Sequence, residues 1–401
     1  MSNEIIKRYQ VQTLSAQIHR QFGGVTTEEL GPSKVIDVPK ERQCRCLRHR
    51  NGRSAAVDMF KMPNQKKAYF KGLQTCGSVF SCPICAVKIT KHRKEEIETL
   101  IKKTEGYHHY LVTLTIPHYH HQSCAEVREM FMGARRRLKR WDTVKHHAEF
   151  IPYKKYIKHH QYDGSVTTVD VTYGDNGWHI HSHELVTLKE KADLREFRDI
   201  TFQNWTKSVL YSGIDIKNAN AFYRRSVQID ELQGDHLNRM TSYLSKIDAT
   251  KWGASAELSL GYLKKADNRN LTPFGMLHHI NDQETSDERR FAYQKYAPIF
   301  WEYCKTFKGS HYIAFSKGLK AKYGMQDLTD KQIVDAENLF DDFYGFWEDY
   351  EWQQIKKHRL RGFVVQNSEG TFEELTEKLR LQMQVLQNEK KTKRQRVFKA
   401  A

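Results

Sequence analysis

Apolar residues recur with two different periods along the chain, and these periods distinguish the predicted strands from the predicted helices. Residues 108–117, HHYLVTLTIP, hold a run of leucine, valine and threonine that ends at a proline, which indicates a buried strand. Residues 86–104 are charged with apolar positions at helical spacing, and residues 123–141 form a second, basic helix. Two later runs, GSVTTVDVTY and WHIHSHELVTL, flank the turn sequence GDNG and predict a hairpin.

The order of these elements predicts the fold class. Helical segments follow the hairpin at about 188–212 and 231–250, and the chain beyond the sequence NLTPFGML is mostly helical in pattern. We therefore expect an α+β fold with a central antiparallel sheet, flanking helices, a cysteine-rich N-terminal region and a helical C-terminal region. The expected segments are a polar, lightly packed lead-in (1–40), a cysteine-rich region with a helix (41–105), a central domain (106–275) and a helical region with a basic tail (276–401).

The composition limits the partners of the protein. The 401 residues include 65 Lys and Arg against 48 Asp and Glu, a formal net charge of +17, which favours a polyanion such as nucleic acid. A membrane is the weaker candidate, because no apolar run approaches the roughly 20 residues that span a bilayer. The N-terminal sequence MSNEIIKRYQ lacks the apolar stretch of a secretory signal, so we expect a cytoplasmic protein.

Three histidines stand at alternate positions in one predicted strand. The stretch GWHIHSHELV, residues 177–186, contains His179, His181 and His183. Alternate side chains of a strand point to the same face, so the three rings are expected to project together. Exposed surface histidines are the plain alternative in a chain with 20 histidines. The regular spacing beside a hairpin turn favours a metal site.

Asp170, on the preceding strand, is the candidate acidic ligand, and its position depends on the hairpin register. A four-residue loop pairs Asp170 with His181, and a two-residue loop pairs it with His183. A three-residue loop turns Asp170 to the opposite face. In the favoured registers, a carboxylate and imidazoles converge, a set that suits Mn²⁺, Mg²⁺ or another divalent ion with positions open to substrate oxygens.

Five of the seven cysteines cluster near the N-terminus. An odd number of cysteines in a long chain argues against a disulfide framework. The sequence CPIC forms a Cys-x-x-Cys knuckle and CRC offers an opposing pair, so a structural Zn²⁺ site is expected, with buried free thiols or a redox pair as alternatives. His49 is a possible substitute ligand. The candidate ligands are Cys44, Cys46, Cys76, Cys82 and Cys85.

Several motifs together resemble one enzyme family. The segment GWHIHSHELV resembles the HUH motif of rolling-circle replication initiators, especially plasmid Rep proteins of the pC194/pUB110 type. YLVTLT is similar to their first motif, VDVTYGDNGWH to their acidic strand, and SYLSK, with Tyr243 and Lys246, to their Tyr-x-x-Lys motif. NLTPFGML and KGSHYIAFSKGLK also resemble segments that follow the tyrosine. The resemblance extends from about Cys76 to Lys320.

The resemblance implies an HUH endonuclease fold and a metal-dependent enzyme that nicks and rejoins DNA. Tyr243 is then the nucleophile, which forms a 5′-phosphotyrosine and leaves a free 3′-OH, and Lys246 stabilises the phenolate or the phosphate. The implied partner is single-stranded or hairpin DNA at a plasmid or phage origin, with host helicase and polymerase as further partners. An HUH-type transposase and a non-catalytic, zinc-containing DNA-binding regulator are the alternatives.

The chain departs from the family pattern at two positions. Arg239 stands where these proteins carry a glutamate four residues before the tyrosine, and Glu184 stands where they carry an apolar residue. The pair Tyr262 and Lys265 repeats the Tyr-x-x-Lys spacing and competes with Tyr243. Substitutes for the missing glutamate are Glu231, Asp235 and Glu257.

Basic and aromatic stretches lie outside these motifs. ARRRLKRW and KKTKRQR are candidate phosphate contacts, and origin recognition is assigned either to the zinc region or to the C-terminal helices. LFDDFYGFWEDYEW spaces its aromatic residues as a helix does, and we expect this helix to pack on a core.

Overall fold

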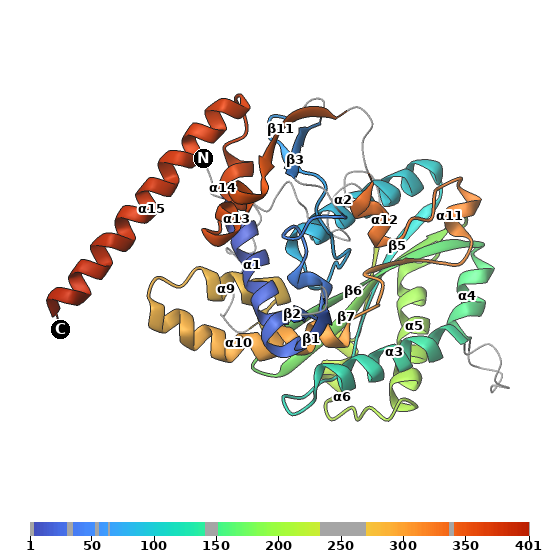
Figure 1. Ribbon diagram of the computed structural model, residues 1–401. Helices are drawn as coiled ribbons and strands as arrows, with labels where there is room; N and C mark the ends of the chain where they lie inside the picture. Colours follow the sequence, from blue (N-terminus) through green and yellow to red (C-terminus); the bar gives the residue numbers. More distant parts are fainter. Residues whose placement is uncertain are drawn as a thin grey trace. The chain divides into compact units, whose positions relative to one another are not determined.

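The chain divides into two compact units (Figure 1). Unit 1 combines Met1–Ala86 with Asp330–Ala401, and unit 2 is Val87–Thr329. The computed structural model describes residues 4–29, 35–52, 56–62, 65–140, 151–232, 270–336 and 341–400.

Unit 2 is built on an antiparallel sheet with the strand order β10-β6-β7-β5-β8, and β9 pairs with β6 beside this path. The strands are β5 (His108–Thr115), β6 (Tyr162–Gly174), β7 (Gly177–Leu188), β8 (Val227–Leu232), β9 (Asn270–Leu271) and β10 (Ile313–Phe315). The hairpin β6–β7 is the one expected from the GDNG turn. It supplies the long central strands of the sheet (Figure 1).

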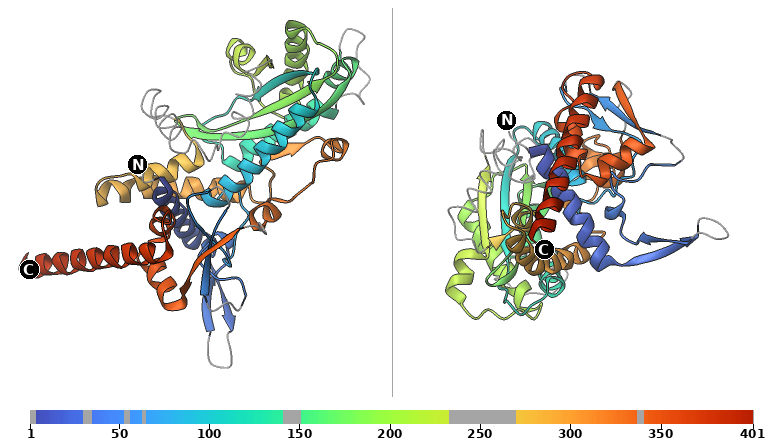
Figure 2. Two further views of the ribbon diagram at one scale, coloured as in Figure 1. Left: turned by 90° about the horizontal axis from the view of Figure 1, so that it is seen from above. Right: turned by 60° about the vertical axis from the view of Figure 1, so that its left-hand side comes forward.

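Helices cover both faces of this sheet (Figure 2). On one face, Ile97 and Leu100 of α2 pack on Leu111, Val166 and Leu185 of the strands. On the other face, α3, α4 and α5 contact β7, β6 and β8 respectively. The helices are α2 (Pro83–Lys103), α3 (Cys124–Arg140), α4 (Tyr153–His159), α5 (Leu194–Leu210), α6 (Ala219–Arg225), α9 (Pro273–Asn281), α10 (Ser286–Thr306) and α11 (Leu319–Lys322).

Unit 1 joins the two ends of the chain through a three-stranded sheet with the order β11-β3-β4. Its N-terminal elements are α1 (Glu4–Gly23), β1 (Val25–Glu29), β2 (Val35–Pro39), η1 (Arg42–Cys44), β3 (Ala56–Lys61) and β4 (Tyr69–Phe70). Its C-terminal elements are α12 (Asp330–Asp335), β11 (Asp342–Glu348), α13 (Asp349–Lys357), α14 (Arg361–Gln366) and α15 (Phe372–Ala400).

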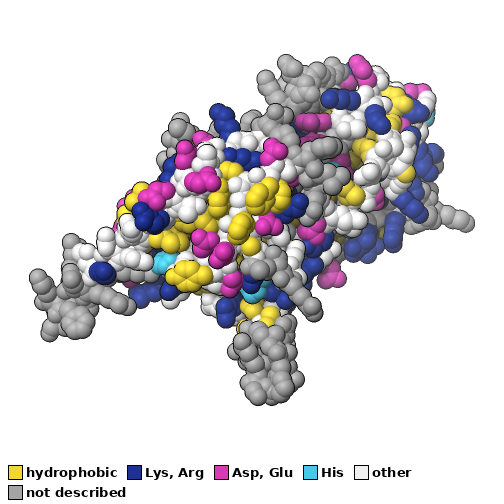
Figure 3. Space-filling model, turned by 45° about the horizontal axis from the view of Figure 1, so that its top comes forward, with side chains coloured by type: hydrophobic (Ala, Val, Ile, Leu, Met, Phe, Trp, Pro, Cys, Tyr) yellow, Lys and Arg dark blue, Asp and Glu magenta, His cyan; other side chains and the backbone are white. Residues whose placement is uncertain are grey.

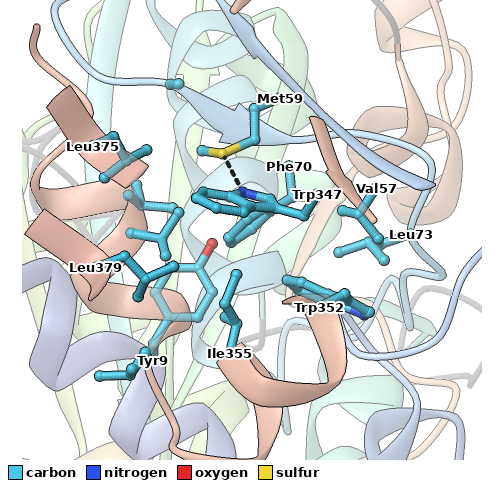
Figure 4. Close-up of a cluster of buried hydrophobic side chains, with 14 residues drawn as sticks. Tyr9, Val57, Met59, Phe70, Leu73, Trp347, Trp352, Ile355, Leu375 and Leu379 are labelled. Carbon is cyan, nitrogen blue, oxygen red and sulfur yellow. Dashed lines mark hydrogen bonds between the residues drawn. The ribbon is translucent and has the colours of Figure 1, made fainter. Parts of the chain in front are cut away.

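The core of unit 1 lies under this small sheet (Figure 4). Trp347 of β11 is buried and donates a hydrogen bond from Nε1 to Sδ of Met59 on β3 at 3.0 Å. Trp352 of α13 and Leu375 of α15 belong to the same cluster. Residues from both ends of the sequence therefore share one apolar core.

The predicted α+β class, with an antiparallel sheet, flanking helices and a helical C-terminal region, is confirmed. Two local expectations are corrected. Residues 4–23, expected to be part of a lightly packed lead-in, form α1 with Val11 and Ile18 fully buried. The aromatic stretch expected as one helix contains the strand β11, and α13 begins only at Asp349.

No helix among the described residues is both long enough and apolar enough to cross a bilayer.

Candidate functional site

The β6–β7 hairpin brings a carboxylate to the face that carries the histidines. Asp170 is paired with His181, the register expected for a loop at 174–177, and His183 is paired with Thr168. Oδ2 of Asp170 lies 3.6 Å from Nε2 of His181 and 3.5 Å from Nε2 of His183. The sheet therefore gathers a carboxylate and two imidazoles from facing strands.

This group has the chemistry of a divalent metal site. One ligand atom each of Asp170, His181 and His183 lies within 4.8 Å of the others. His183 is buried, whereas the side chains of Asp170 and His181 are 16% and 17% exposed, so the group is reached from solvent. Two imidazoles and a carboxylate could hold a divalent ion and leave positions for other oxygen ligands.

A threonine of the neighbouring strand orients His183. Thr113 of β5 lies directly opposite His183, and its Oγ1 is 2.9 Å from Nδ1 of the ring. This contact leaves Nε2 on the side of Asp170. Such a hydrogen bond to the remote ring nitrogen fixes the orientation of a histidine ligand. Thr113 belongs to the YLVTLT motif, but the sequence did not predict its contact with His183. That contact follows from the pairing of β5 with β7.

His179 lies next to the group and has a different partner. Its ring centroid is 4.9 Å from that of His181, and its Nδ1 is 2.8 Å from Nε2 of His118. Nδ1 of His118 is 3.1 Å from the carbonyl oxygen of Asn176. A carbonyl only accepts, so His118 carries its proton on Nδ1 and accepts from Nδ1 of His179. Nε2 of His179 therefore keeps its lone pair.

Both members of this imidazole pair are neutral at neutral pH. Burial, followed by the charge of His118, lowers the pKa of His179 to about 4. Burial also lowers the pKa of His118, although its hydrogen bond to the backbone of Asn176 acts in the opposite direction. His118 follows the first predicted strand, and nothing in its spacing predicted this contact.

Glu184, the residue that departs from the family pattern, faces away from the histidines. It is 4% exposed, and its Oε1 is 2.7 Å from Nζ of Lys139 on α3. Burial alone would raise the pKa of Glu184, but Lys139 and Arg135 outweigh burial and lower it. Glu184 therefore forms a charged pair with α3, on the face of the sheet opposite the histidines.

Tyr243 and Lys246 lie outside the described residues, as do Arg239, Asp235, Glu257, Tyr262 and Lys265. Glu231 is described and forms ion pairs with Lys191 at 3.4 Å and His108 at 3.8 Å. It is paired with Tyr110 on β5, roughly 10 Å along the strand from Thr113.

Four of the five candidate cysteines form a second group, in unit 1. Sγ of Cys46 lies 3.7 Å from that of Cys82 and 3.6 Å from that of Cys85, and Cys76 lies 3.6 Å from Cys85. These separations match the edges of a tetrahedron around an ion with metal–sulfur distances of about 2.3 Å. All four side chains are buried, and hydrogen bonds from Cys46, Cys76 and Cys82 lower the pKa of Cys85 well below its usual value.

The remaining candidates lie outside this thiol group. Cys44 is buried, and its Sγ donates to the carbonyl oxygen of Ala16 at 3.4 Å. His49 is exposed and is not a member of the group. The sequence left the choice of four ligands open, and the geometry selects Cys46, Cys76, Cys82 and Cys85 as the set that could hold a metal ion.

Comparison with known proteins gives one informative match. No family model matches the chain, and no solved structure matches it. A curated protein named "Protein rep", from Streptomyces lividans, is 26% identical to the chain over 310 residues, which cover 67% of each chain. The chain is thus similar to a Rep protein over the larger part of its length.

Proposed function

We propose that the protein is a replication initiator that nicks one DNA strand at a rolling-circle origin and later rejoins the ends. The observation that carries the proposal is the convergence of Asp170, His181 and His183 on one sheet face. The HUH-like motifs around these residues and the similarity to a protein named Rep support the same function.

The proposed ligands of the catalytic ion are Asp170, His181 and His183, with His179 beside them. A bound Mn²⁺ or Mg²⁺ would polarise the scissile phosphate and offset its negative charge. Thr113 keeps the His183 ring turned toward Asp170, so the ligand atoms are positioned before DNA arrives. Such positioning lowers the cost of ordering the site at the moment of reaction.

Tyr243 is the proposed nucleophile. Its phenolate oxygen attacks the phosphorus, the bond to the 3′ oxygen breaks, and that oxygen takes up a proton to become a 3′-OH. The new phosphotyrosine bond conserves the energy needed for rejoining. An unperturbed tyrosine has a pKa near ~10, so a nearby cation is needed to favour the phenolate, and we assign this role to Lys246.

The cysteine group is proposed to bind a structural Zn²⁺ through Cys46, Cys76, Cys82 and Cys85. Four buried thiols at tetrahedral separations are the donor set that structural zinc sites use. Zinc would link the segment around Cys46 to the start of α2, where Cys85 lies.

The proposed function is tested by incubating the protein with a single-stranded origin oligonucleotide and Mn²⁺ or Mg²⁺. We expect a covalent protein–DNA adduct and a free 3′ end. Tyr243→Phe should abolish the adduct but leave DNA binding intact, whereas Tyr262→Phe should form the adduct normally. His181→Ala should also abolish it. An adduct that survives Tyr243→Phe would place the nucleophile elsewhere, and DNA binding by the wild type without an adduct would support a non-catalytic regulator.

A further inference from the structure

The net charge does not by itself locate a nucleic-acid surface. The face in Figure 3 mixes Lys and Arg with Asp and Glu side chains, and hydrophobic side chains lie between them. In unit 1, two basic segments that are distant in the sequence meet.

The start of the cysteine-rich region is packed against the turn between α13 and α14. Nε1 of Trp352 donates to the carbonyl oxygen of Arg48 at 3.1 Å. Nη1 of Arg361 donates to the carbonyl oxygen of Leu47 at 2.8 Å. These hydrogen bonds join the basic segments 45–50 and 356–361 into one region.

Two arginines of this region, Arg48 and Arg361, interact electrostatically with Cys46 and Cys82 of the thiol group. Arg361 is buried and donates to Oε1 of Gln12 at 2.7 Å. Burial, followed by the charge of Arg48, lowers the pKa of Arg361 to about 9, and the thiols of Cys46 and Cys82 act in the opposite direction. Four thiolates around a zinc ion carry a net negative charge, and these two inner arginines lie where they can offset it.

Four other cations of the region make up what we call the outer basic surface: Arg45, Arg50, Lys356 and Arg359, with the exposed Lys357 beside them in the sequence. Arg359 is exposed and the other three are half-buried. Arg50 is paired with Asp349 at 3.0 Å. Burial lowers the pKa of Lys356, and the charges of Arg50, Arg361 and Arg48 lower it further against the opposing effect of Asp349. The surface therefore concentrates like charges that an external anion would stabilise.

Arg359 also occupies a backbone position that usually holds glycine. Its φ is +59°, in the left-handed region. The N–H of Arg359 donates to the carbonyl of Lys356 at 3.1 Å, and the N–H of Leu360 donates to that of Ile355 at 2.8 Å, which is the Schellman arrangement at the end of α13. A side chain at this position is strained relative to glycine. Arg359 thus presents a cation where folding alone would favour glycine.

We propose that the outer basic surface binds the phosphate backbone of DNA. The inference rests on the proposed function, which makes DNA the partner, and it locates the contact on unit 1. Guanidinium and ammonium groups on a surface fixed by the thiol group suit phosphates, and such contacts position a protein on DNA without reading its sequence. The cysteine region and the C-terminal helices, which the sequence offers as alternatives for origin contact, then act as one surface.

The test compares charge-neutralised variants of the full-length protein. The triple variant Arg45→Gln/Lys356→Gln/Arg359→Gly removes three of the four outer cations. The control Lys66→Gln/Lys378→Gln removes two exposed lysines of the same unit. The dissociation constant for duplex and for single-stranded DNA is measured between 50 and 300 mM salt. In a plot of the logarithm of the binding constant against the logarithm of the salt concentration, each phosphate contact is expected to contribute about 0.9 to the slope on duplex and about 0.7 on a single strand.

We expect the triple variant to bind DNA at least about tenfold more weakly at 0.1 M salt. The slope of its logarithmic salt plot should be smaller than that of the wild type by about two to three. The larger loss of slope, on duplex or on single strands, identifies the form that the surface contacts. Arg359→Gly alone should weaken binding while its melting temperature stays equal or rises, because glycine relieves the strained φ. A weaker affinity in that variant cannot then be attributed to misfolding.

The inference is overturned if the triple variant keeps the affinity and salt dependence of the wild type, or if the control loses as much as the triple variant. The covalent adduct with a short origin oligonucleotide is measured on the same preparations. If the wild type forms the adduct but the triple variant binds DNA normally, the surface inference fails and the proposed function stands. If the wild type neither binds DNA nor forms the adduct, both fail.

Discussion

The ion pair between Lys139 of α3 and Glu184 of β7 allows a quantitative prediction. Lys139 holds Glu184, which is 4% exposed, through a contact of 2.7 Å. Replacing Lys139 by Met keeps the length of the side chain and removes its charge. The carboxylate is then left in the sheet interior with Arg135 as its remaining cationic neighbour. We expect Lys139→Met to destabilise unit 2.

The magnitude follows from the burial of the two partners. Removing one partner of a fully buried ion pair costs about 3–5 kcal/mol. The Lys139 side chain is 42% exposed, so solvent screens part of the interaction, and Arg135 compensates another part. The expected loss of unfolding free energy is therefore about 1–3 kcal/mol. For a domain of this size, a loss of about 2 kcal/mol lowers the melting temperature by roughly 4–8 °C.

Thermal and urea unfolding measure this cost. Arg137→Met is the matched control, because Arg137 is an exposed cation of the same helix, and it should leave the melting temperature nearly unchanged. The double variant Lys139→Met/Glu184→Leu should be more stable than Lys139→Met alone, because no charge is left buried. The reasoning is refuted if Lys139→Met unfolds like the wild type, or if the double variant is the less stable of the two.

Three further perturbations address the site and its supports. Thr113→Val should lower Mn²⁺ affinity by about 10–100-fold in a calorimetric titration, because it removes the hydrogen bond to His183, whereas Thr168→Val on the other side of His183 should not. Gly177→Ala should lower the melting temperature, because φ is +80° and the added methyl would meet a backbone atom at 3.0 Å; an unchanged value would contradict the hairpin geometry. Cys85→Ser should release stoichiometric zinc, detected with a chromogenic chelator, and a full zinc content would place the ion elsewhere.

The sequence predicted the centre of unit 2 well, because its signals there are local. The alternation of WHIHSHELVTL and the GDNG turn predicted the hairpin and the shared face of the histidines, but three loop lengths left the register of β6 and β7 open. The structure has the register expected for a loop at 174–177, in which Asp170 is opposite His181. The Cys-x-x-Cys knuckle likewise predicted a thiol group. Choosing among the five thiols required the fold, because the helix α1 occupies the surroundings of Cys44.

Unit 1 was less predictable, because its stabilising contacts join residues almost three hundred positions apart. The aromatic residues from Phe343 to Trp347 can be placed on one side of a helix, but pairing with β3 extends them into a strand with a bulge between Phe343 and Gly345. That pairing turns Trp347 inward onto Met59 and leaves Phe343 60% exposed. Tertiary contacts thus override the local spacing of the aromatic residues. The partner strand β3 lies too far away in the sequence to be recognised from the residues around β11.

The position of His179 shows what the spacing of residues in a strand can and cannot predict. Residues at period two share one face of β7, and the ring centroid of His179 is 4.9 Å from the next imidazole in the row. Whether a ring can act as a ligand depends on which nitrogen carries the proton, and that is set by the loop after β5, which brings His118 within 2.8 Å. Because the carbonyl of Asn176 fixes the proton of His118, it also fixes that of His179. A row of histidines therefore specifies a polar face, whereas contacts across strands decide which nitrogen atoms are available to a metal ion.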